Sequence, residues 1–250
     1  MTDSALVFTH IHKCSGSSLR RMLHAKYRAI FPAERMHIPE ITCRDIDNLP
    51  MLEARGEPLP RDLWLLADHS PHGIYEERVL ASLPRFRIAL LREPLDRLES
   101  LYHFFVRAGF LPEELKEFID LETMPEQVWE RLCQHFLELS GYVRWFDPVG
   151  QDVSAAVDRL LAYDVLGRHD DLADFCSRFS DRNPHGVRLS ATDVLHVNAT
   201  ARPAPLSRVQ QEIAYEALAT DYAIWEHAQV QRALRGNTPD AAARGARDHR

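Results

Sequence analysis

Short apolar runs alternate along the chain with longer stretches in which apolar residues recur at helical spacing. Four runs are predicted to form strands, at residues 6–10, 64–67, 87–91 and 164–167. From Ser17 to Phe31 the apolar positions follow one face of a helix, and Pro94 stands where a first-turn proline opens another helix, which continues through Phe105. Further helical patterns occupy residues 112–146, 170–179, 207–220 and 221–235.

This alternation of strands and helices predicts an α/β domain of three layers, with a central, mainly parallel sheet flanked by helices. We expect a single domain over residues 1–235 and a poorly ordered tail over 236–250, where the sequence is small, polar and aperiodic. Ligands of such sheets bind at the carboxyl ends of the strands. The loops that follow the predicted strands are therefore the first places to look for chemistry.

Composition narrows the classes of partner. The formal net charge of −7 disfavours nucleic acid and anionic membranes as partners, so an anionic ligand needs a local basic pocket. No apolar run approaches the roughly 18 residues of a membrane helix, and the first residues lack the pattern of a leader peptide, which favours a cytoplasmic protein without a membrane span. The cysteines show no metal-binding or disulfide spacing, so reduced thiols are expected at these positions: Cys14, Cys43, Cys133 and Cys176.

The loop after the first predicted strand reads HIHKCSGSSL, at residues 10–19. Free backbone N–H groups and the positive end of a helix dipole make such a strand–loop–helix junction a site for anions. The small residues let a phosphate approach the backbone, and Lys13, one of only three lysines, supplies a mobile charge. The candidate binding residues are Lys13, Cys14, Ser15, Gly16, Ser17 and Ser18.

Two other interpretations of this loop stay open. One is an ordinary serine-capped helix start. The other is a zinc or copper site, because His10, His12 and Cys14 would share one face of an extended strand. The predicted turn interrupts that geometry before Cys14, so no metal is expected. The loop is not a Walker A motif, since Lys13 precedes Gly16 and no glycine precedes the lysine.

The third predicted strand ends in Arg92, and Ser100 lies about two turns into the helix that follows. An arginine and a serine placed in this way suit a second phosphate, which the guanidinium can bind through two parallel hydrogen bonds. The alternative is a surface helix with an ion pair between Arg97 and Glu93 at i, i+4 spacing.

Together the two loops resemble motifs of the sulfotransferases related to heparan sulfate 2-O-sulfotransferase. HIHKCSGSSL is similar to the family's HIPKTGGTSL loop, and Arg92-Glu93-Pro94-x2-Arg97-x2-Ser100-x-Tyr102 to its R-D-P-x-x-R-x-x-S-x-Y element. Weaker likenesses follow in the same order along the chain, at residues 166–170, 196–200 and 221–225. The resemblance runs from about residue 6 to 228.

The resemblance implies a P-loop-like fold and transfer of a sulfuryl group from 3′-phosphoadenylyl sulfate (PAPS) to a hydroxyl of a carbohydrate or small metabolite. The other product is adenosine 3′,5′-bisphosphate (PAP), and no metal is required. Lys13 is suited to neutralise charge on the departing phosphate oxygen. The chain departs from the family where His12 replaces proline, Cys14 replaces threonine and Ser15 replaces glycine. Ser15 is costly if that position requires a positive φ.

A base is needed to take the proton of the acceptor hydroxyl. Residues 67–73, ADHSPHG, resemble the family's G-H-x-x-x-G segment, whose histidine is the base, and His69 stands at that position. An imidazole with a pKa near 6.5 suits this role near neutral pH. Asp68 and His72 are the alternative bases.

Two other functions remain alternatives. One is a nucleotide kinase, which the position of Lys13 and the lack of an evident magnesium-binding carboxylate disfavour. The other is a nucleotide-binding module without catalysis, for which only the altered residues Cys14 and Ser15 speak.

Overall fold

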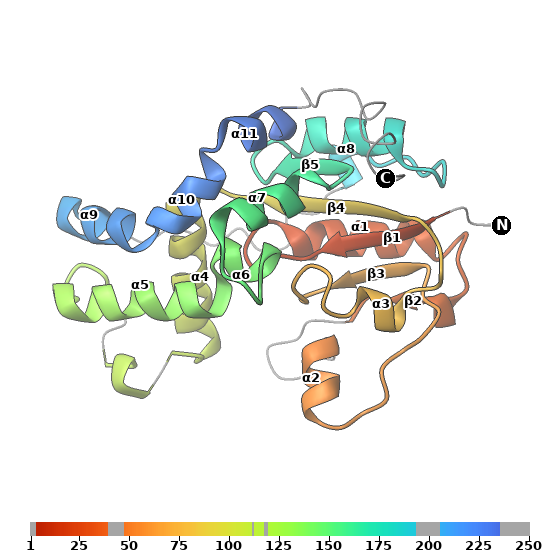
Figure 1. The fold of residues 1–250 in the computed structure, drawn as a ribbon. Coiled ribbons are helices and arrows are strands. Elements are labelled where there is room, and N and C mark those ends of the chain that lie inside the picture. Colours follow the sequence, from red (N-terminus) through yellow and green to blue (C-terminus); the bar gives the residue numbers. More distant parts are fainter. Residues whose placement is uncertain (1–3, 40–47, 112, 118–119, 194–205, 236–250) are drawn as a thin grey trace.

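The predicted alternation of strands and helices is present in the computed structural model, which describes residues 4–39, 48–111, 113–117, 120–193 and 206–235 (Figure 1). Within these residues one sheet has five parallel strands in the order β2-β3-β1-β4-β5. The strands are β1 (Ala5–Thr9), β2 (Met36–His37), β3 (Leu65–Asp68), β4 (Arg85–Leu91) and β5 (Val165–Arg168). The expected α/β class with a parallel central sheet is therefore confirmed.

The predicted strands lie within one or two residues of β1, β3, β4 and β5, whereas the two-residue strand β2 was not predicted. The helix predicted from Ser17 to Phe31 spans Gly16–Tyr27, and Pro94 begins a helix as expected. The helices are α1 (Gly16–Tyr27), α2 (Leu49–Ala54), α3 (Glu76–Val79), α4 (Pro94–Ala108), α5 (Glu126–Ser140), α6 (Tyr142–Phe146), α7 (Val153–Leu161), α8 (Leu172–Arg182), α9 (Arg208–Ala217), α10 (Ala219–Trp225) and α11 (Ala228–Leu234).

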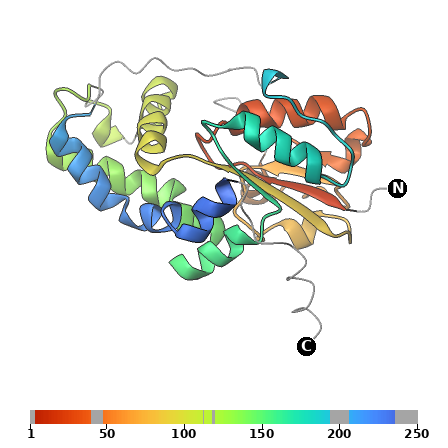
Figure 2. The same cartoon turned by 90° about the horizontal axis from the view of Figure 1, so that it is seen from above.

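Helices cover both faces of the sheet, giving three layers. Helices α1 and α8 lie side by side on one face, and α7 and α11 lie on the other (Figure 2). The alternation of side chains along β1 explains this packing. Leu6 and Phe8 belong to the core that includes α1, whereas Ala5 and Val7 pack with the smaller cluster that includes α2 and α3.

The connection after β1 leaves the sheet on a different face from the connection after β3. The chain leaves β1 toward the face covered by α1, but it leaves β3 for α3 on the opposite face. Such a reversal between adjacent parallel strands is where open α/β sheets bind ligands, at the carboxyl ends. The loops after β1, β3 and β4 meet there, and these are the three loops that the sequence predicts to carry the chemistry.

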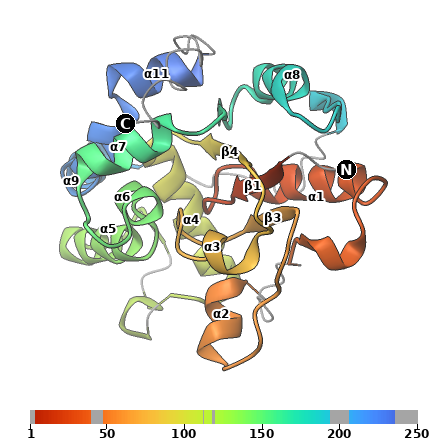
Figure 3. The same ribbon diagram turned by 45° about the vertical axis from the view of Figure 1, so that its right-hand side comes forward.

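A helical lobe formed by α4, α5 and α9 lies beyond the carboxyl ends of the strands (Figures 1 and 3). It has its own apolar core, which includes Trp129 and Phe136 of α5, and Trp129 Nε1 donates a hydrogen bond to the carbonyl oxygen of Gln210 in α9 at 2.8 Å. The lobe therefore stands next to the predicted phosphate loops rather than at the opposite end of the sheet.

A buried ion pair joins this lobe to α10. Arg97 of α4 is only 2% exposed, and its Nη2 donates to Asp221 Oδ2 at 2.7 Å. The alternative prediction of a surface pair between Arg97 and Glu93 is wrong, because Arg97 points into the interior. The Glu93 carboxylate instead accepts hydrogen bonds from the Asp96 backbone and the Tyr222 hydroxyl.

We predict that Arg97→Met lowers the free energy of unfolding by about 3–5 kcal/mol, because it leaves the Asp221 carboxylate buried without its cation. Denaturant unfolding of the variant measures this. Arg208→Met is the matched control: Arg208 forms a pair with Glu212 at the surface, where its side chain is 91% exposed, and its loss should cost less than about 0.5 kcal/mol. Equal losses in the two variants would contradict the structural role of the buried pair.

Candidate functional site

The loop between β1 and α1 has an unusual backbone. Lys13 has a φ of 63° and Ser15 a φ of 60°, both in the left-handed region, which costs on the order of 1 kcal/mol or more for a residue with a side chain. The sequence-based concern about Ser15 was therefore justified. Left-handed residues in a turn bring successive N–H groups together as a concave site for anions. Ser15 is the N-cap residue of α1 and makes no side-chain capping bond, so the serine-capped start weighed for this loop is not what the structure has.

The ring of His10 leaves no room for a side chain at residue 16, which is a glycine. A Cβ atom at residue 16 would lie 1.8 Å from His10 Cδ2, far inside van der Waals contact. The glycine therefore lets the first turn of α1 approach the end of β1 closely. Ser17 and Ser18, the next two residues of α1, are half-buried at this turn. Their hydroxyls remain candidate donors for a bound anion.

Cys14 is turned away from solvent. It is 1% exposed, and its Sγ lies 3.7 Å from the His12 carbonyl oxygen and 4.0 Å from the Tyr142 hydroxyl. Burial raises the pKa of the Cys14 thiol, against the opposing effect of Arg97. The thiol is therefore neutral at pH 7, and only the backbone of Cys14 is suited to contact a ligand.

Arg92 joins the loop after β4 to the loop after β1. Its Nη1 donates to the carbonyl oxygen of Lys13 at 3.2 Å. The Arg92 backbone is held by Tyr142 of α6: the Arg92 N–H donates to the Tyr142 hydroxyl at 3.0 Å, and that hydroxyl donates to the Arg92 carbonyl. The two predicted anion-binding segments are thus in direct contact.

The α4 helix faces the side chain of Lys13. Lys13 Nζ lies 4.7 Å from the centre of the Phe104 ring, a cation–π contact. Ser100 precedes Phe104 by four residues and is half-buried, so it lies one turn earlier on the same face of α4. Lys13, Arg92 and Ser100 therefore surround the same end of the sheet, as the sequence analysis expects.

Three histidines form a stack beside Lys13. The ring centres of His10 and His69 are 3.8 Å apart, and those of His69 and His12 are 4.3 Å apart. Trp145 of α6 meets the His12 ring edge-on at 5.3 Å, and Ser140 Oγ lies 3.4 Å from His12 Nδ1. The loops after β1 and β3 are therefore packed together through imidazole rings.

All three imidazoles are held in the neutral form. Burial is the main cause, and it lowers the pKa of His12 to about 4, with further lowering by Arg97 and Lys13. Burial likewise lowers the pKa of His10 and of His69 well below 6.5, and neighbouring histidines add to the effect. The expectation of a base with a pKa near 6.5 thus does not match the environment of His69, although a neutral ring is able to accept a proton.

The other two candidate bases point elsewhere. Asp68 is the last residue of β3 and faces α2: its Oδ2 accepts the Leu49 N–H at 2.8 Å and its Oδ1 accepts the His69 N–H at 2.6 Å. These bonds fix the start of α2 and the turn after β3. His72 Nδ1 lies 3.1 Å from the Tyr163 hydroxyl, on the face of the sheet opposite the His69 ring. Neither side chain joins the histidine stack.

The metal interpretation of His10, His12 and Cys14 gains no support. Among the described residues no group of three or more histidine, cysteine or acidic side chains is arranged to hold a metal ion. The His10 and His12 rings are separated by the ring of His69, which lies face to face with both. Ring nitrogens in such a stack do not converge on one point, as tetrahedral coordination requires.

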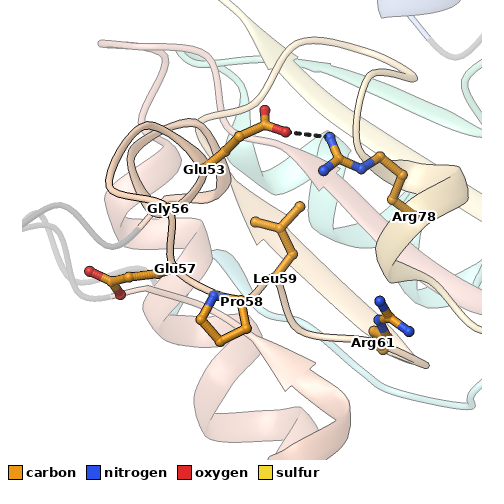
Figure 4. A pocket seen from close by; sticks show the side chains of 7 residues that line it. All are labelled: Glu53, Gly56, Glu57, Pro58, Leu59, Arg61 and Arg78. Carbon is orange, nitrogen blue, oxygen red and sulfur yellow. Dashed lines mark hydrogen bonds and ion pairs between the residues drawn. The ribbon is translucent and has the colours of Figure 1, made fainter.

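A separate hollow of about 550 Å³ lies between α2 and α3, lined by Glu53, Gly56, Glu57, Pro58, Leu59, Arg61 and Arg78 (Figure 4). It shares no residue with the loops that carry Lys13 and Arg92. The Glu53 carboxylate is already engaged, since it accepts hydrogen bonds from Arg78 Nη1 at 2.7 Å and from the Tyr75 hydroxyl at 2.8 Å. We assign this hollow no part in the site.

Sequence reasoning missed the residues that hold the site together. Tyr142 was not singled out, yet its hydroxyl bonds to Arg92 and its ring lies 4.1 Å from the Arg97 guanidinium carbon. Arg97 and Asp221 both stand in the quoted motifs, but their pairing was not predicted. Such contacts join residues 45 to 124 positions apart, which local periodicity does not encode. The weak likeness at residues 196–200 lies outside the described residues.

The chain was also compared with known proteins. It matches no family model, and no curated protein is significantly similar to it in sequence. No helix in the described part of the chain is long and apolar enough to cross a membrane. The residues of the site therefore carry the functional argument by themselves.

We predict that stability falls as the pH is lowered from about 6.5 toward 4. The unfolded chain binds protons on these histidines below about 6.5, whereas the fold keeps them neutral, so stability is complete above that pH and declines by up to about 1.4 kcal/mol per pH unit for each histidine. Urea unfolding at pH 7, 5.5 and 4.5 measures the slope. His12→Gln should reduce it, and His24→Gln, at an exposed position of α1, should not. A slope unchanged in His12→Gln would argue against a neutral His12.

Proposed function

We propose that the protein is a sulfotransferase with a P-loop-like fold, which moves a sulfuryl group from PAPS to a hydroxyl of a carbohydrate or small metabolite. The observation that carries the proposal is the hydrogen bond from Arg92 Nη1 to the Lys13 carbonyl oxygen. It joins the two segments whose residues match the family's two nucleotide-binding motifs. Those segments are 79 residues apart in sequence, so their contact is independent of the motif likeness.

Two of the segments with weaker similarity to the family also lie at this end of the sheet. Asp221, from the segment at 221–225, pairs with Arg97 of the second motif. Arg168, from the segment at 166–170, lies with its guanidinium carbon 5.6 Å from the centre of the Trp225 ring. Residues chosen for their order along the chain are thus also in contact in space, which supports the resemblance.

In this proposal the β1–α1 loop binds the phosphate that carries the sulfuryl group, through its backbone N–H groups and the Ser17 and Ser18 hydroxyls. Arg92 and Ser100 bind the 3′-phosphate of the same nucleotide. The acceptor oxygen forms a bond to sulfur as the bond between sulfur and the phosphate oxygen breaks, and the electron pair of that bond stays on the phosphate. Lys13 neutralises the charge that develops there.

The proton of the acceptor hydroxyl goes to an imidazole of the histidine stack. The resemblance nominates His69, and the alternative base Asp68 is disfavoured because both of its carboxylate oxygens accept backbone hydrogen bonds on the other face of the sheet. A neutral imidazole beside a bound anion is able to take the proton, because the negative phosphates favour the imidazolium form.

We predict that PAP binds without magnesium and raises the melting temperature. A ligand at 100 times its dissociation constant adds about 2.7 kcal/mol to the free energy of unfolding. Thermal unfolding with PAP, with adenosine 5′-phosphate, and with ATP plus magnesium measures this, and PAP should stabilise most because only it carries a 3′-phosphate. Stabilisation by ATP with magnesium alone would instead favour the kinase alternative.

We predict that Arg92→Gln and Lys13→Ala separate binding from catalysis. Arg92→Gln keeps a donor for the Lys13 carbonyl but removes the charge, so PAP affinity should fall about ten- to a hundredfold. Lys13→Ala should lower kcat by roughly 10²–10³ with little change in PAP affinity, since its charge acts as the bond breaks. Titration calorimetry and transfer kinetics measure the two effects.

The control for both variants is Arg107→Gln, which removes a charge from an exposed position of α4, the helix that follows Arg92. It should change neither PAP affinity nor kcat. If Lys13→Ala weakens PAP binding and leaves kcat at saturating donor intact, the two residues have the opposite roles.

A further inference from the structure

The three stacked histidines differ in how a substrate can reach them. His10 is 2% exposed and His69 is 8% exposed, whereas His12 is half-buried. His69 is the middle ring, so His10 covers one of its faces and His12 covers the other. His10 and His12 are the two end rings of the stack, and His12 directly precedes Lys13 in the chain.

One nitrogen of His69 is also enclosed. Its Nδ1 is buried and has no hydrogen-bond partner among the described residues. A base must approach the proton that it takes to about 3 Å between heavy atoms. An acceptor hydroxyl therefore has less access to His69, which is 8% exposed, than to the half-buried His12.

The contacts of His12 orient its ring for this role. Ser140 Oγ lies 3.4 Å from His12 Nδ1, on the edge of the ring that faces α5 and α6. If Nδ1 carries the proton and donates to that oxygen, Nε2 on the other side of the ring is the acceptor nitrogen. The same contact, together with Trp145 and His69, fixes the plane of the His12 ring.

We propose that His12 is the catalytic base of the transfer, which takes the acceptor proton on Nε2, and that His69 is a positioning residue that holds the His12 ring by stacking. The inference rests on the proposed sulfotransferase function and names a residue within it. As the acceptor oxygen bonds to sulfur and the phosphate oxygen departs with its electron pair, the proton passes to Nε2 and His12 becomes an imidazolium.

The charges around His12 suit this step. Burial, with smaller contributions from Arg97 and Lys13, lowers its pKa to about 4, and the neighbouring imidazoles of His10 and His69 are neutral. The free protein therefore presents a neutral His12 at pH 7. Bound donor phosphates are negative and stand on the side of Lys13, so they stabilise the imidazolium when it forms.

The test uses the full chain with ³⁵S-labelled PAPS and a panel of monosaccharides and phenols as acceptors. We expect His12→Gln to lower kcat by roughly 10²–10⁴, with the PAP dissociation constant unchanged. The acid limb of the kcat/KM profile should disappear in His12→Gln and persist, shifted in pH, in His69→Gln. His24→Gln, at an exposed position of α1, is the control.

A second readout separates a base from a structural residue. Phenols of lower pKa need less help to lose their proton, so the loss of rate in His12→Gln should shrink as the acceptor becomes more acidic, and the loss in His69→Gln should not. His12→Pro, which carries the residue of the resembling family, is the second variant if Gln perturbs the loop, and PAP binding reports whether each variant keeps its site.

The outcomes are distinguishable. Loss of the acid limb in His69→Gln with its retention in His12→Gln would make His69 the base and overturn the inference alone. If both variants keep the acid limb of the kcat/KM profile, neither histidine is the base. If the unaltered protein neither binds PAP nor transfers label to any acceptor, the proposed function fails and the inference fails with it.

Discussion

The buried ion pair between Arg97 and Asp221 determines how the helices surround the end of the sheet. Burial is the largest single effect and opposes the charge of Arg97, but Asp221, Tyr142 and Cys14 together outweigh it, and the pKa of Arg97 is raised. The other polar atoms of the pair are only partly engaged: Asp221 Oδ1 accepts the Tyr142 N–H at 2.7 Å, whereas Arg97 Nε and Nη1 have no hydrogen-bond partner among the described residues. The Arg97 guanidinium also lies over the Tyr142 ring, so the pair fixes α4, α6 and α10 together.

The site depends on this pair through a continuous series of contacts. Asp221 holds the start of α6, and the Tyr142 side chain then holds the Arg92 backbone. Arg92 in turn holds the carbonyl oxygen of Lys13, whose backbone is in the left-handed region. A strained conformation persists when its surroundings determine it from several sides. The interior of the helical lobe thus stabilises a loop backbone that its own sequence disfavours.

The sequence predicted most of what depends on local pattern and chain order. The strands β1, β3, β4 and β5, the start of α4 at Pro94 and the meeting of the Lys13 and Arg92 loops all follow from periodicity and from the rule for parallel sheets. Short elements such as β2 carry too few residues for a period to show. The wrong surface pair of Arg97 with Glu93 has another cause. An i, i+4 spacing describes an isolated helix, and here the tertiary partner Asp221 takes the arginine.

The histidines show why a motif alone is a poor guide to the role of a side chain. The resemblance assigns a role to His69 from its place after β3, and it assigns none to His12, which replaces a proline. Packing favours His12 instead, because the turn after β1 brings the His12 ring over His69, and His12 is half-buried whereas His69 is buried. A residue that departs from the family pattern thus covers the residue that matches it. Any chemistry inferred from His69 must therefore be reconsidered in terms of His12.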